Sequence, residues 1–406
     1  HGRHHWLAKR GSSSSVVAFV PRNERTLAEK TLAELPPDVP RVVIPVHDGP
    51  VGMLAALAHV FPLVLGCGKA RHIDPGRPGV PAFGRRIYRL NAFGRNAPPH
   101  RALPDPEQAA IERKASKPRV RLEQDGEYRF WRSAYKRSLE RVNAGRYAAV
   151  VFDYDGTICS ADERISGCGP RVLDLLSWIL KSGVDVGIAT GRGKSVGEVL
   201  RSGLPKPLWS QVTVGYYNGG QVGTLADLTT PDGVASVDKS FAFALKALKS
   251  CRRLGQIAAI EPRKTQITIT AESSRNGAEC RRLLQHCVQS KLGGRAKLVC
   301  STHSFDVLPL EVTKLRVVNQ LEEGEGDTLV VGDMGRWPGN DYELLSHPFA
   351  LSVDQVSPDP TSGWNFAPPG VSGVDAVLSY FSGATIDKSG RLRVKVRKGK
   401  PRGTQG

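Results

Sequence analysis

The sequence predicts an α/β protein built around a doubly wound parallel sheet, and three observations lead to this fold class. Apolar segments of strand length alternate with segments whose apolar residues recur at helical spacing. Three of the predicted strands run directly into a carboxylate or hydroxyl residue. A long segment with an antiparallel texture interrupts the alternation. We therefore expect a parallel-sheet core with an inserted α/β domain, preceded by a further α/β block.

The first predicted block covers residues 1–92 and is itself an α/β unit. Its strand and helix segments follow one another in turn, which favours a parallel sheet. The chain begins with His1 rather than Met, which indicates either processing or a fragment. The expected elements are strands at 16–21 and 41–46 and helices at 23–35 and 50–66.

A long apolar run occupies residues 51–68 of this block. It contains His59, Pro62 and three glycines, so we expect a buried helix rather than a membrane span. No sequence typical of a signal peptide precedes the run. The seven cysteines occur singly, without a CxxC pair, which indicates reduced thiols. These features predict a cytoplasmic protein that does not contact a membrane.

Lysine and arginine outnumber aspartate and glutamate by 57 to 39, which gives a net charge of +18. Such an excess attracts anionic partners, among them phosphorylated metabolites and nucleic acids. The excess is spread along the chain, with local concentrations at 112–141 and 388–402. An ordinary arginine-rich surface therefore explains the charge equally well.

Residues 93–146 are expected to form a linker followed by a charged helical segment. The composition at 95–118 shifts to Pro, Ala, Arg and Lys, as in exposed linkers. The following sequence YRFWRSAYKRSLERV is expected to be helical. At the other end of the chain, residues 386–406 are basic and lack an apolar face, so we expect a disordered tail there.

The second block, residues 147–385, contains three apolar strands that end on polar residues. The first strand runs into Asp153 and Asp155, the second into Thr190 and the third into Asp333. In open parallel sheets, ligands bind at the carboxyl ends of the strands. We therefore expect these side chains to meet at one crevice.

An insert at about 219–305 separates the second of these strands from the third. Its segments GQIAAIEP and QITITAE alternate as half-buried strands, and CRRLLQHCVQ has helical spacing. Helices over one face of an antiparallel sheet suit an inserted domain. Candidate substrate contacts are Arg263, Lys264 and Gln266 between the two strands, although an ordinary charged turn is an equally good interpretation.

Paired carboxylates at a strand end require a chemical explanation. Side chains at positions i and i+2 point in the same direction, so their charges repel. Mg²⁺ relieves this repulsion with oxygen ligands and shares phosphate oxygens with them. A carboxylate next to a bound phosphoryl group is also a competent nucleophile. Taken alone, the Asp-Gly pair indicates a turn and Lys314 a surface residue, but the ordered set of strand ends favours chemistry.

These residues resemble the four ordered motifs of the haloacid dehalogenase (HAD) superfamily of phosphotransferases. The motifs are DYDGT at 153–157, Thr190 in IATGRG, Lys314 in EVTKLRVV and GDMGRWPGND at 332–341. The last is longer than the compact GDxxND arrangement, and no glycine or asparagine follows Lys314. The insert resembles the large α/β cap of the sugar-phosphate phosphatase branch, which includes Cof-like and sucrose-phosphate phosphatases, and YYNGGQV at 216–222 resembles its hinge.

The resemblance implies a Mg²⁺-dependent phosphatase with specific residue roles. Asp153 is the implied nucleophile, which forms an aspartyl phosphate, and Asp155 is the implied general acid and base. Thr190 and Lys314 would hold the phosphoryl oxygens. The implied metal ligands are Asp153, Asp155 through its backbone carbonyl, Asp333 and Asp341. The implied substrate-binding residues are Thr190, Gly191, Arg192, Asn218 and Lys314.

The N-terminal block carries a second resemblance, to the latter half of a sugar isomerase (SIS) domain. The resemblance rests on HGRHH at the start, two strand-helix units and DPGRPGVPAFGRRIYRL at 74–90. It implies a fold that binds phosphosugars and allows homo-oligomers, with the first half of the domain upstream of His1. The cluster of His1, His4 and His5 has no carboxylate or cysteine nearby, so we interpret it as incidental rather than as a metal site.

The expected function is hydrolysis of a phosphorylated sugar or sugar derivative. One alternative is a phosphatase that acts on phosphorylated nucleic-acid ends, which the net positive charge suggests. A second is a non-enzymatic module that senses phosphosugars, against which the intact Asp153, Asp155 and Asp333 argue. His286 and His303 could reach the site from the insert, but solvated or structural roles are expected for both.

Overall fold

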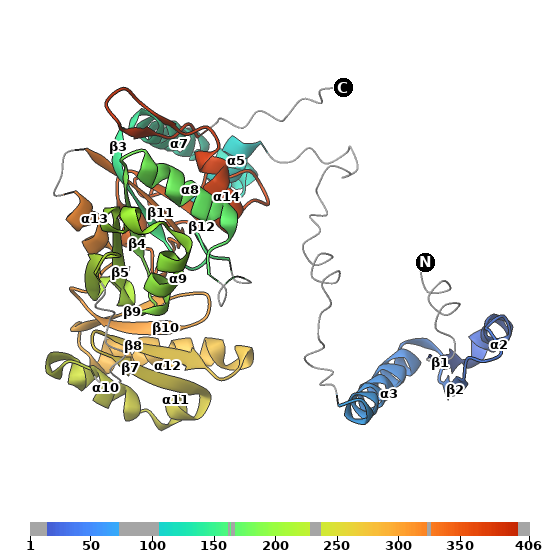
Figure 1. The fold of residues 1–406 in the computed structure, drawn as a ribbon. Helices are drawn as coiled ribbons and strands as arrows, with labels where there is room; N and C mark the ends of the chain where they lie inside the picture. The colour runs from blue at the N-terminus through green and yellow to red at the C-terminus, as the bar shows by residue number, and fades with distance from the viewer. Residues whose placement is uncertain are drawn as a thin grey trace, which may run out of the picture. The chain divides into compact units, whose positions relative to one another are not determined.

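The computed structural model contains two compact units, His1–Ala97 and Pro98–Gly406 (Figure 1). The residues that the structure describes are 14–72, 105–160, 163, 167–227, 237–322 and 326–396.

The first unit contains a small parallel sheet with two helices. Strands β1 (Val16–Pro21) and β2 (Arg41–Val46) pair in parallel, as their alternation with helices predicts. The helical elements are η2 (Arg22–Glu24), α2 (Arg25–Ala33) and α3 (Gly49–Ala70). The predicted closing segment at 74–90 and the cluster of His1, His4 and His5 lie outside the described residues.

Helix α3 differs from the buried helix that the sequence predicts. Its apolar side chains face outward, with Met53 and Phe61 exposed by 74% and 67%. Only two strands and one other helix pack within this unit, so no second layer covers α3 among the described residues. By length and composition alone, α3 is the one described helix that could cross a membrane.

The main sheet of the second unit places the predicted strands side by side. Its strand order is β12-β11-β3-β4-β5-β6, and all neighbours are parallel except β6, which runs antiparallel at the edge. The strands are β3 (Tyr147–Asp153), β4 (Asp185–Ala189), β5 (Val212–Tyr216), β6 (Gln221–Thr224), β11 (Asp327–Met334) and β12 (Ala350–Gln355).

Helices cover both faces of this sheet, because successive strand residues point to opposite sides. Val150 packs in the cluster that includes helix α8, whereas Val151 packs in the cluster that includes helix α13. Both faces are therefore apolar, as expected for a parallel sheet. The helical elements are α8 (Pro170–Lys181), α9 (Ser195–Gly203), α13 (Leu315–Leu321), α14 (Gly373–Phe381), η4 (Lys206–Gln211), η5 (Tyr217–Gly219) and η8 (Leu344–Ser346).

The segment predicted to be a linker and charged helix is part of this unit. It forms α5 (Pro106–Ala115), α6 (Arg119–Gln124) and α7 (Tyr128–Ala144). Ile111 and Leu122 are fully buried, and the Tyr135 ring lies edge-on to Trp364 with centroids 5.8 Å apart. The prediction of an exposed linker is wrong for α5 because its few apolar residues share one face that packs on the core.

The predicted tail is also ordered over its first part. Strands β13 (Thr385–Ile386) and β14 (Leu392–Arg393) pair with each other, and Leu392 lies opposite Tyr147, the first residue of β3. The prediction of disorder from residue 386 is therefore wrong up to 396. The reason is a period-two pattern in RLRVKV, which buries Leu392, Val394 and Val396. Residues 397–406 lie outside the described residues.

The insert forms a second sheet next to the carboxyl end of the main sheet (Figure 1). Its strand order is β7-β8-β10-β9 with antiparallel neighbours, as predicted. It begins later than expected, because β6 belongs to the main sheet. Its elements are η6 (Lys239–Phe241), α10 (Ala242–Lys249), α11 (Arg252–Ile257), β7 (Ala258–Arg263), β8 (Gln266–Ala271), η7 (Ser274–Asn276), α12 (Gly277–Lys291), β9 (Ala296–Cys300) and β10 (Phe305–Pro309).

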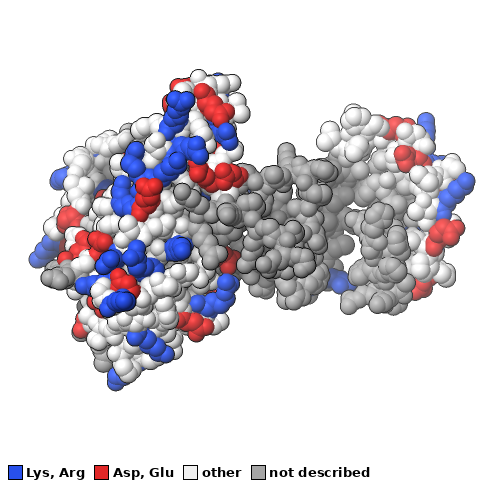
Figure 2. Space-filling model, turned by 90° about the horizontal axis from the view of Figure 1, so that it is seen from above, with Lys and Arg blue, Asp and Glu red and all other residues white. Residues whose placement is uncertain are grey.

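Positive and negative side chains are interspersed on the face shown in Figure 2. Basic residues of the segment from α5 to α7 pair with nearby carboxylates, for example Arg119 with Glu123 at 2.7 Å and Lys117 with Glu127 at 2.9 Å. Exposed pairs of this kind contribute little to stability. They do reduce the local excess of positive charge.

Candidate active site

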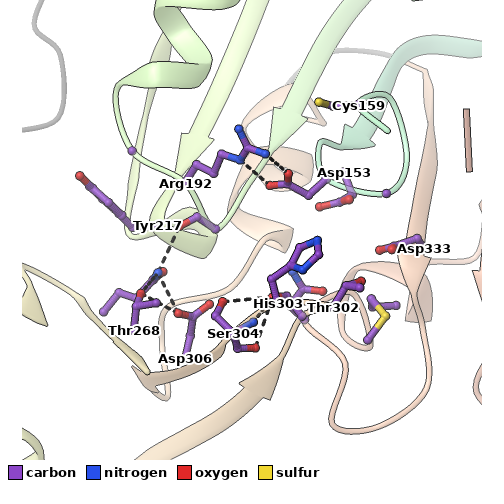
Figure 3. A pocket seen from close by; sticks show the side chains of 18 of the residues that line it. Asp153, Cys159, Arg192, Tyr217, Thr268, Thr302, His303, Ser304, Asp306 and Asp333 are labelled. Atoms are coloured by element: carbon purple, nitrogen blue, oxygen red, sulfur yellow. Dashed lines mark hydrogen bonds and ion pairs between the residues drawn. The ribbon is translucent and has the colours of Figure 1, made fainter. Parts of the chain in front are cut away.

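Three strand ends place polar side chains at one point of the main sheet. Asp153 ends β3, Thr190 follows β4 directly, and Asp333 lies near the end of β11. Because β11, β3 and β4 are parallel neighbours, their carboxyl ends meet at the same edge. All three residues are buried, with Asp153 exposed by 1%. The predicted crevice is therefore present, and Figure 3 shows the cavity above it.

Lys314 lies beneath this cavity, immediately before helix α13. Its Nζ donates to Asp153 Oδ1 at 2.5 Å and to Asp341 Oδ1 at 2.7 Å. Burial works against the ammonium, but the charges of Asp153 and Asp341 raise the pKa of Lys314 above its usual value. Lys314 is thus a permanent positive charge, and the interpretation of it as a surface residue is excluded.

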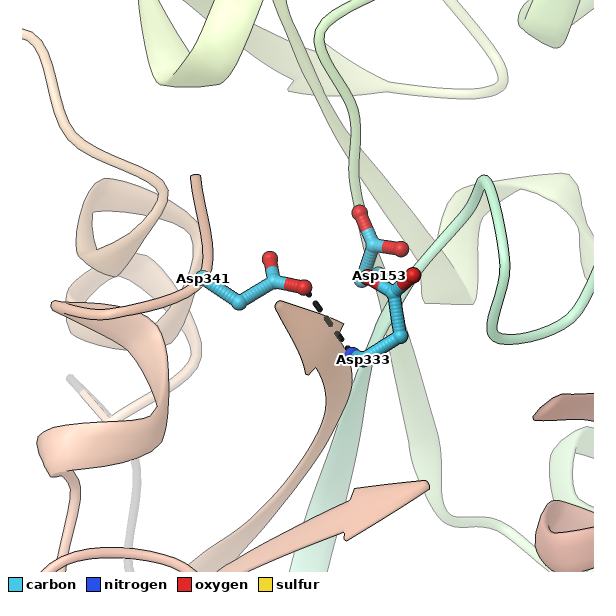
Figure 4. A group of neighbouring side chains, drawn as sticks. All are labelled: Asp153, Asp333 and Asp341. Carbon is cyan, nitrogen blue, oxygen red and sulfur yellow. Dashed lines mark hydrogen bonds between the residues drawn. The ribbon is translucent and has the colours of Figure 1, made fainter. Parts of the chain in front are cut away.

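Asp341 braces the turn that follows β11 (Figure 4). Its Oδ2 accepts from the backbone amides of Asp333 and Met334 at 3.0 and 3.1 Å, and its Oδ1 accepts from Lys314. Burial disfavours the charge, but Lys314 and these donors hold the pKa of Asp341 below its usual value. Both oxygens of Asp341 therefore have hydrogen-bond partners already.

Three buried carboxylates form a group that could hold a metal ion. Ligand atoms of Asp153, Asp333 and Asp341 all lie within 4.8 Å of one another. Asp153 Oδ2 is buried and has no hydrogen-bond partner. Burial, followed by the neighbouring negative charges, raises the pKa of Asp153 to about 8 and that of Asp333 to about 10. Without a cation the charged form of these carboxyl groups is disfavoured, and an oxygen-only donor set of this kind fits Mg²⁺.

Gly156 allows Asp333 to approach the strand end closely. Its φ is +82°, a conformation that favours glycine, and a Cβ there would lie 2.2 Å from Asp333 Oδ2. The glycine of DYDGT is therefore required both by the turn and by the carboxylate packed against it.

The Asp155 carboxylate pairs with a basic side chain and is not among the three grouped aspartates. It forms an ion pair with the guanidinium of Arg192, whose Nε lies 2.8 Å from Asp155 Oδ2. Arg192 also lies over the Tyr154 ring, 5.3 Å from its centroid. The Asp155 side chain is 34% exposed and lines the cavity. Asp155 is therefore partly exposed to the cavity and held in its ion pair with Arg192.

The hinge residue Asn218 takes part in a buried polar network. Its Nδ2 donates to Gln266 Oε1 at 2.9 Å and to Asp306 Oδ2 at 3.2 Å. Gln266 donates in turn to Asp306 Oδ1 at 3.0 Å and to the carbonyl of Gly191 at 3.1 Å. Asn218 and Gln266 therefore join the insert to the turn after Thr190, while Asn218 Oδ1 is buried without a hydrogen-bond partner and Gln266 also lines the cavity.

Asp306 is a site residue that sequence reasoning missed. It is 3% exposed, and burial raises its pKa to about 6 despite hydrogen bonds from Thr268 and Asn218. A carboxylate within the apolar strand sequence FDVLP is the signal that could have identified it.

The cavity has a volume of about 340 Å³ and lies between the main sheet and the insert (Figure 3). Of the predicted substrate contacts, Gly191 and Arg192 line it, whereas Thr190 and Lys314 lie deeper. Arg263 lines it and Lys264 does not. The lining residues from the insert are Glu261, Arg263, Gln266, Thr268, Ser301, Thr302, His303, Ser304 and Asp306.

The two histidines of the insert differ in position. His303 lines the cavity and extends toward Arg192 and Asp153 (Figure 3). His286 is exposed on α12 and is not among the lining residues. Both histidines are exposed, as expected for solvated side chains, but only His303 is among the residues that line the cavity.

No family model matches the sequence, and no curated protein matches it either. Solved structures resemble parts of the chain at low identity. The C-terminal domain of trehalose-6-phosphate phosphatase from C. albicans is 16% identical, covers 49% of this chain and 73% of its own, and gives a TM-score of 0.39. A sugar phosphatase of HAD subclass IIB is 17% identical, with coverages of 58% and 98% and a TM-score of 0.42. A HAD/COF-like hydrolase from Plasmodium vivax is 19% identical, with coverages of 59% and 97% and a TM-score of 0.42.

Proposed function

We propose that this protein is a Mg²⁺-dependent phosphatase that hydrolyses a phosphorylated sugar or sugar derivative. The observation that carries the proposal is the state of Asp153 at the floor of the cavity. One of its oxygens is held by Lys314, and the other is buried without a partner beside Asp333. A fixed carboxylate next to a cation and a metal-binding group is suited to attack a phosphoryl group.

Each neighbouring residue has a role in this proposal. Asp153 attacks phosphorus and forms an aspartyl phosphate, while Asp155 gives a proton to the leaving oxygen and then accepts one from water. Lys314 and Thr190 hold the phosphoryl oxygens. The residues that would hold Mg²⁺ are Asp153, Asp333 and the Asp155 backbone carbonyl, with Asp341 in support. When bound, the ion would neutralise charge on the phosphoryl oxygens.

The insert acts in this proposal as a cap that reads the leaving group. Its described lining residues carry hydroxyl, amide, carboxylate, guanidinium and imidazole groups, which suit a leaving group rich in hydroxyls. Single-stranded nucleic acids are bound largely by stacking of bases on aromatic rings. Among the described lining residues, Tyr217 is the only Phe, Tyr or Trp. The sugar phosphate is therefore preferred to a nucleic-acid end.

The test is phosphate release from a panel of hexose and pentose monophosphates and 5′-phosphorylated oligonucleotides, with Mg²⁺ present. We expect a preferred sugar phosphate, loss of activity in excess chelator, and no detectable turnover by Asp153→Asn with an unchanged far-UV circular dichroism spectrum. Turnover by Asp153→Asn close to that of the parent would refute the nucleophile. Preferred hydrolysis of oligonucleotides with a steep salt dependence would establish the nucleic-acid alternative.

A further inference from the structure

The longer turn of the last motif contacts the insert, which its sequence alone does not predict. Two residues of GDMGRWPGND, Pro338 and Asn340, bond to Cys300 at the end of β9. The Cys300 amide donates to the carbonyl of Pro338 at 2.8 Å, and the Asn340 amide donates to the carbonyl of Cys300 at 2.9 Å. The turn from the main sheet thus forms a parallel bridge with strand β9 of the insert. This turn is four residues longer than the compact GDxxND arrangement, and the additional residues are 335–338.

Strand β9 is the edge strand of the insert's sheet. Its outer edge would otherwise present unpaired backbone groups, and the turn satisfies two of them. A second link lies beside the bridge, where Lys297 Nζ contacts Glu343 Oε1 at 2.7 Å. The insert and the main sheet are therefore fastened to each other at β9, in addition to the network at Asn218.

The bridge lies at the base of a hairpin tip, residues 301–304, between β9 and β10. Within the tip, the Ser301 amide donates to the carbonyl of Ser304 at 2.9 Å, and Ser301 Oγ accepts from the amides of His303 and Ser304 at 3.3 and 3.1 Å. These bonds constrain the backbone of the tip. Thr302 and His303 consequently point into the cavity, and their side chains are exposed to it.

We propose that residues 335–340 are a clamp that holds this hairpin tip over the phosphate site, so that His303 contacts the leaving group and determines specificity. The inference rests on the proposed phosphatase function and deepens it. Pro338 and Asn340 act as positioning residues through their backbone groups, whereas His303 touches the substrate. A fixed recognition group costs less ordering entropy on binding than a mobile one.

The first test compares His303→Ala with His286→Ala, the matched exposed histidine on α12. The readout is the ratio of kcat/KM for the preferred sugar phosphate to that for p-nitrophenyl phosphate. We expect His303→Ala to lower this ratio about tenfold, the effect of one hydrogen bond, and His286→Ala to leave it unchanged. An unchanged ratio in His303→Ala would overturn the assignment of His303.

The second test breaks the clamp. Deletion of residues 335–338 restores the compact spacing of Asp333 and Asp341, and Cys300→Pro removes the donor to Pro338 while leaving Asp341 in place. Proline is tolerated on the outer edge of a sheet, so Cys300→Pro keeps the test valid where the deletion does not fold. We expect both variants to lower the same ratio. Discrimination equal to that of the parent in Cys300→Pro would overturn the clamp.

Hydrogen exchange separates this inference from the proposed function. In the full chain, the amides of Cys300 and Asn340 should exchange slowly, and Cys300→Pro should speed exchange at Asn340 while leaving strand β8 unchanged. Fast exchange of both amides in the parent would refute the clamp whatever the activity. Slow exchange in a parent that hydrolyses no ester would instead refute the phosphatase and the role of His303.

Discussion

Lys114 and Lys314 are both almost completely buried in the second unit, but their environments are opposite. Lys314 contacts two carboxylates, which raise its pKa. Lys114 donates to the carbonyl of Gly363 at 2.7 Å and to Ser362 Oγ at 2.8 Å, and lies over the Trp364 ring. Burial among these uncharged partners lowers the pKa of Lys114 to about 7, although Asp359 opposes the shift.

The difference shows that burial does not by itself identify a functional lysine. Lys114 fastens helix α5 to the C-terminal part of the chain with hydrogen bonds to neutral groups. Lys314 belongs to a group in which three carboxyl groups lie together with one ammonium, and burial with mutual repulsion raises the pKa of Asp153 and Asp333. A buried group of carboxyls that repel one another is the feature that indicates chemistry here, because a bound cation would relieve the repulsion.

The largest expected effect is that of Lys314→Met. Loss of the ammonium leaves Asp153 and Asp341 buried without a cation, which should destabilise the protein by roughly 3–5 kcal/mol. Turnover of p-nitrophenyl phosphate should also fall by a factor of about 10² or more, because the phosphoryl charge loses its partner. Urea unfolding and steady-state kinetics measure the two effects. Stability equal to that of the parent would remove the distinction between the two lysines.

The next effect concerns Asp333, one of the three carboxyl groups in the same cluster. Asp333→Asn removes one of the repelling carboxylates, so the melting temperature without metal should rise. In the parent, Mg²⁺ at about 100 times its Kd should stabilise by ~2.7 kcal/mol, and this gain should be lost in Asp333→Asn. Thermal unfolding with and without Mg²⁺ is the measurement. An equal Mg²⁺ response in both proteins would exclude Asp333 from the metal site.

Lys114→Met should affect stability but not chemistry. The unfolded chain holds a proton on Lys114 up to pH 10.5, whereas the folded chain releases it near pH 7, so its contribution to stability should rise between these values. Lys114→Met should remove this rise. Because the substitution also removes the hydrogen bonds to residues 362 and 363, it should lower the free energy of unfolding at pH 9 by roughly 1–3 kcal/mol. Urea midpoints at pH 7 and pH 9 test this. A large loss of p-nitrophenyl phosphatase activity at full stability would contradict it.

The smallest effect is expected far from both lysines, at the end of the chain. Removing residues 397–406 should leave kcat/KM for a sugar phosphate and the urea midpoint unchanged. The control is removal of residues 387–406, which also takes away the buried Leu392, Val394 and Val396. Each of these apolar side chains contributes ~1.5–3 kcal/mol on burial, so the longer truncation should destabilise strongly. Equal effects of the two truncations would show that β14 adds nothing to the core.

Much of the core and site could be predicted from short stretches of sequence. An apolar strand that runs into Asp153, another that runs into Thr190 and a third that runs into Asp333 are local patterns. In a parallel sheet they necessarily bring their carboxyl ends to one edge. The antiparallel texture of the insert was equally readable. The resemblance of the N-terminal block to SIS domains stays a prediction.

The partners of the charged groups could not be predicted from short stretches of sequence. Asp155 pairs with Arg192, 37 positions away, and Asp306 with Asn218, 88 positions away. The sequence of helix α5 predicts a linker, whereas in the structure one face of the helix is buried and its residues contact residues 362–367. Which groups desolvate each other depends on contacts that are distant in sequence, so pKa shifts and pairings follow from packing alone.

The sequence by itself determined which residues stand at the strand ends, because alternation and apolar runs fix strands and strand ends fix the crevice. Only the tertiary structure decided how those residues are used. It turned Asp341 into a brace for Lys314 and the amide of Asp333, and it joined the longer turn at 335–340 to the free edge of β9. The physical reason is that local patterns specify elements, whereas hydrogen-bond partners and charge compensation are selected only when the elements meet.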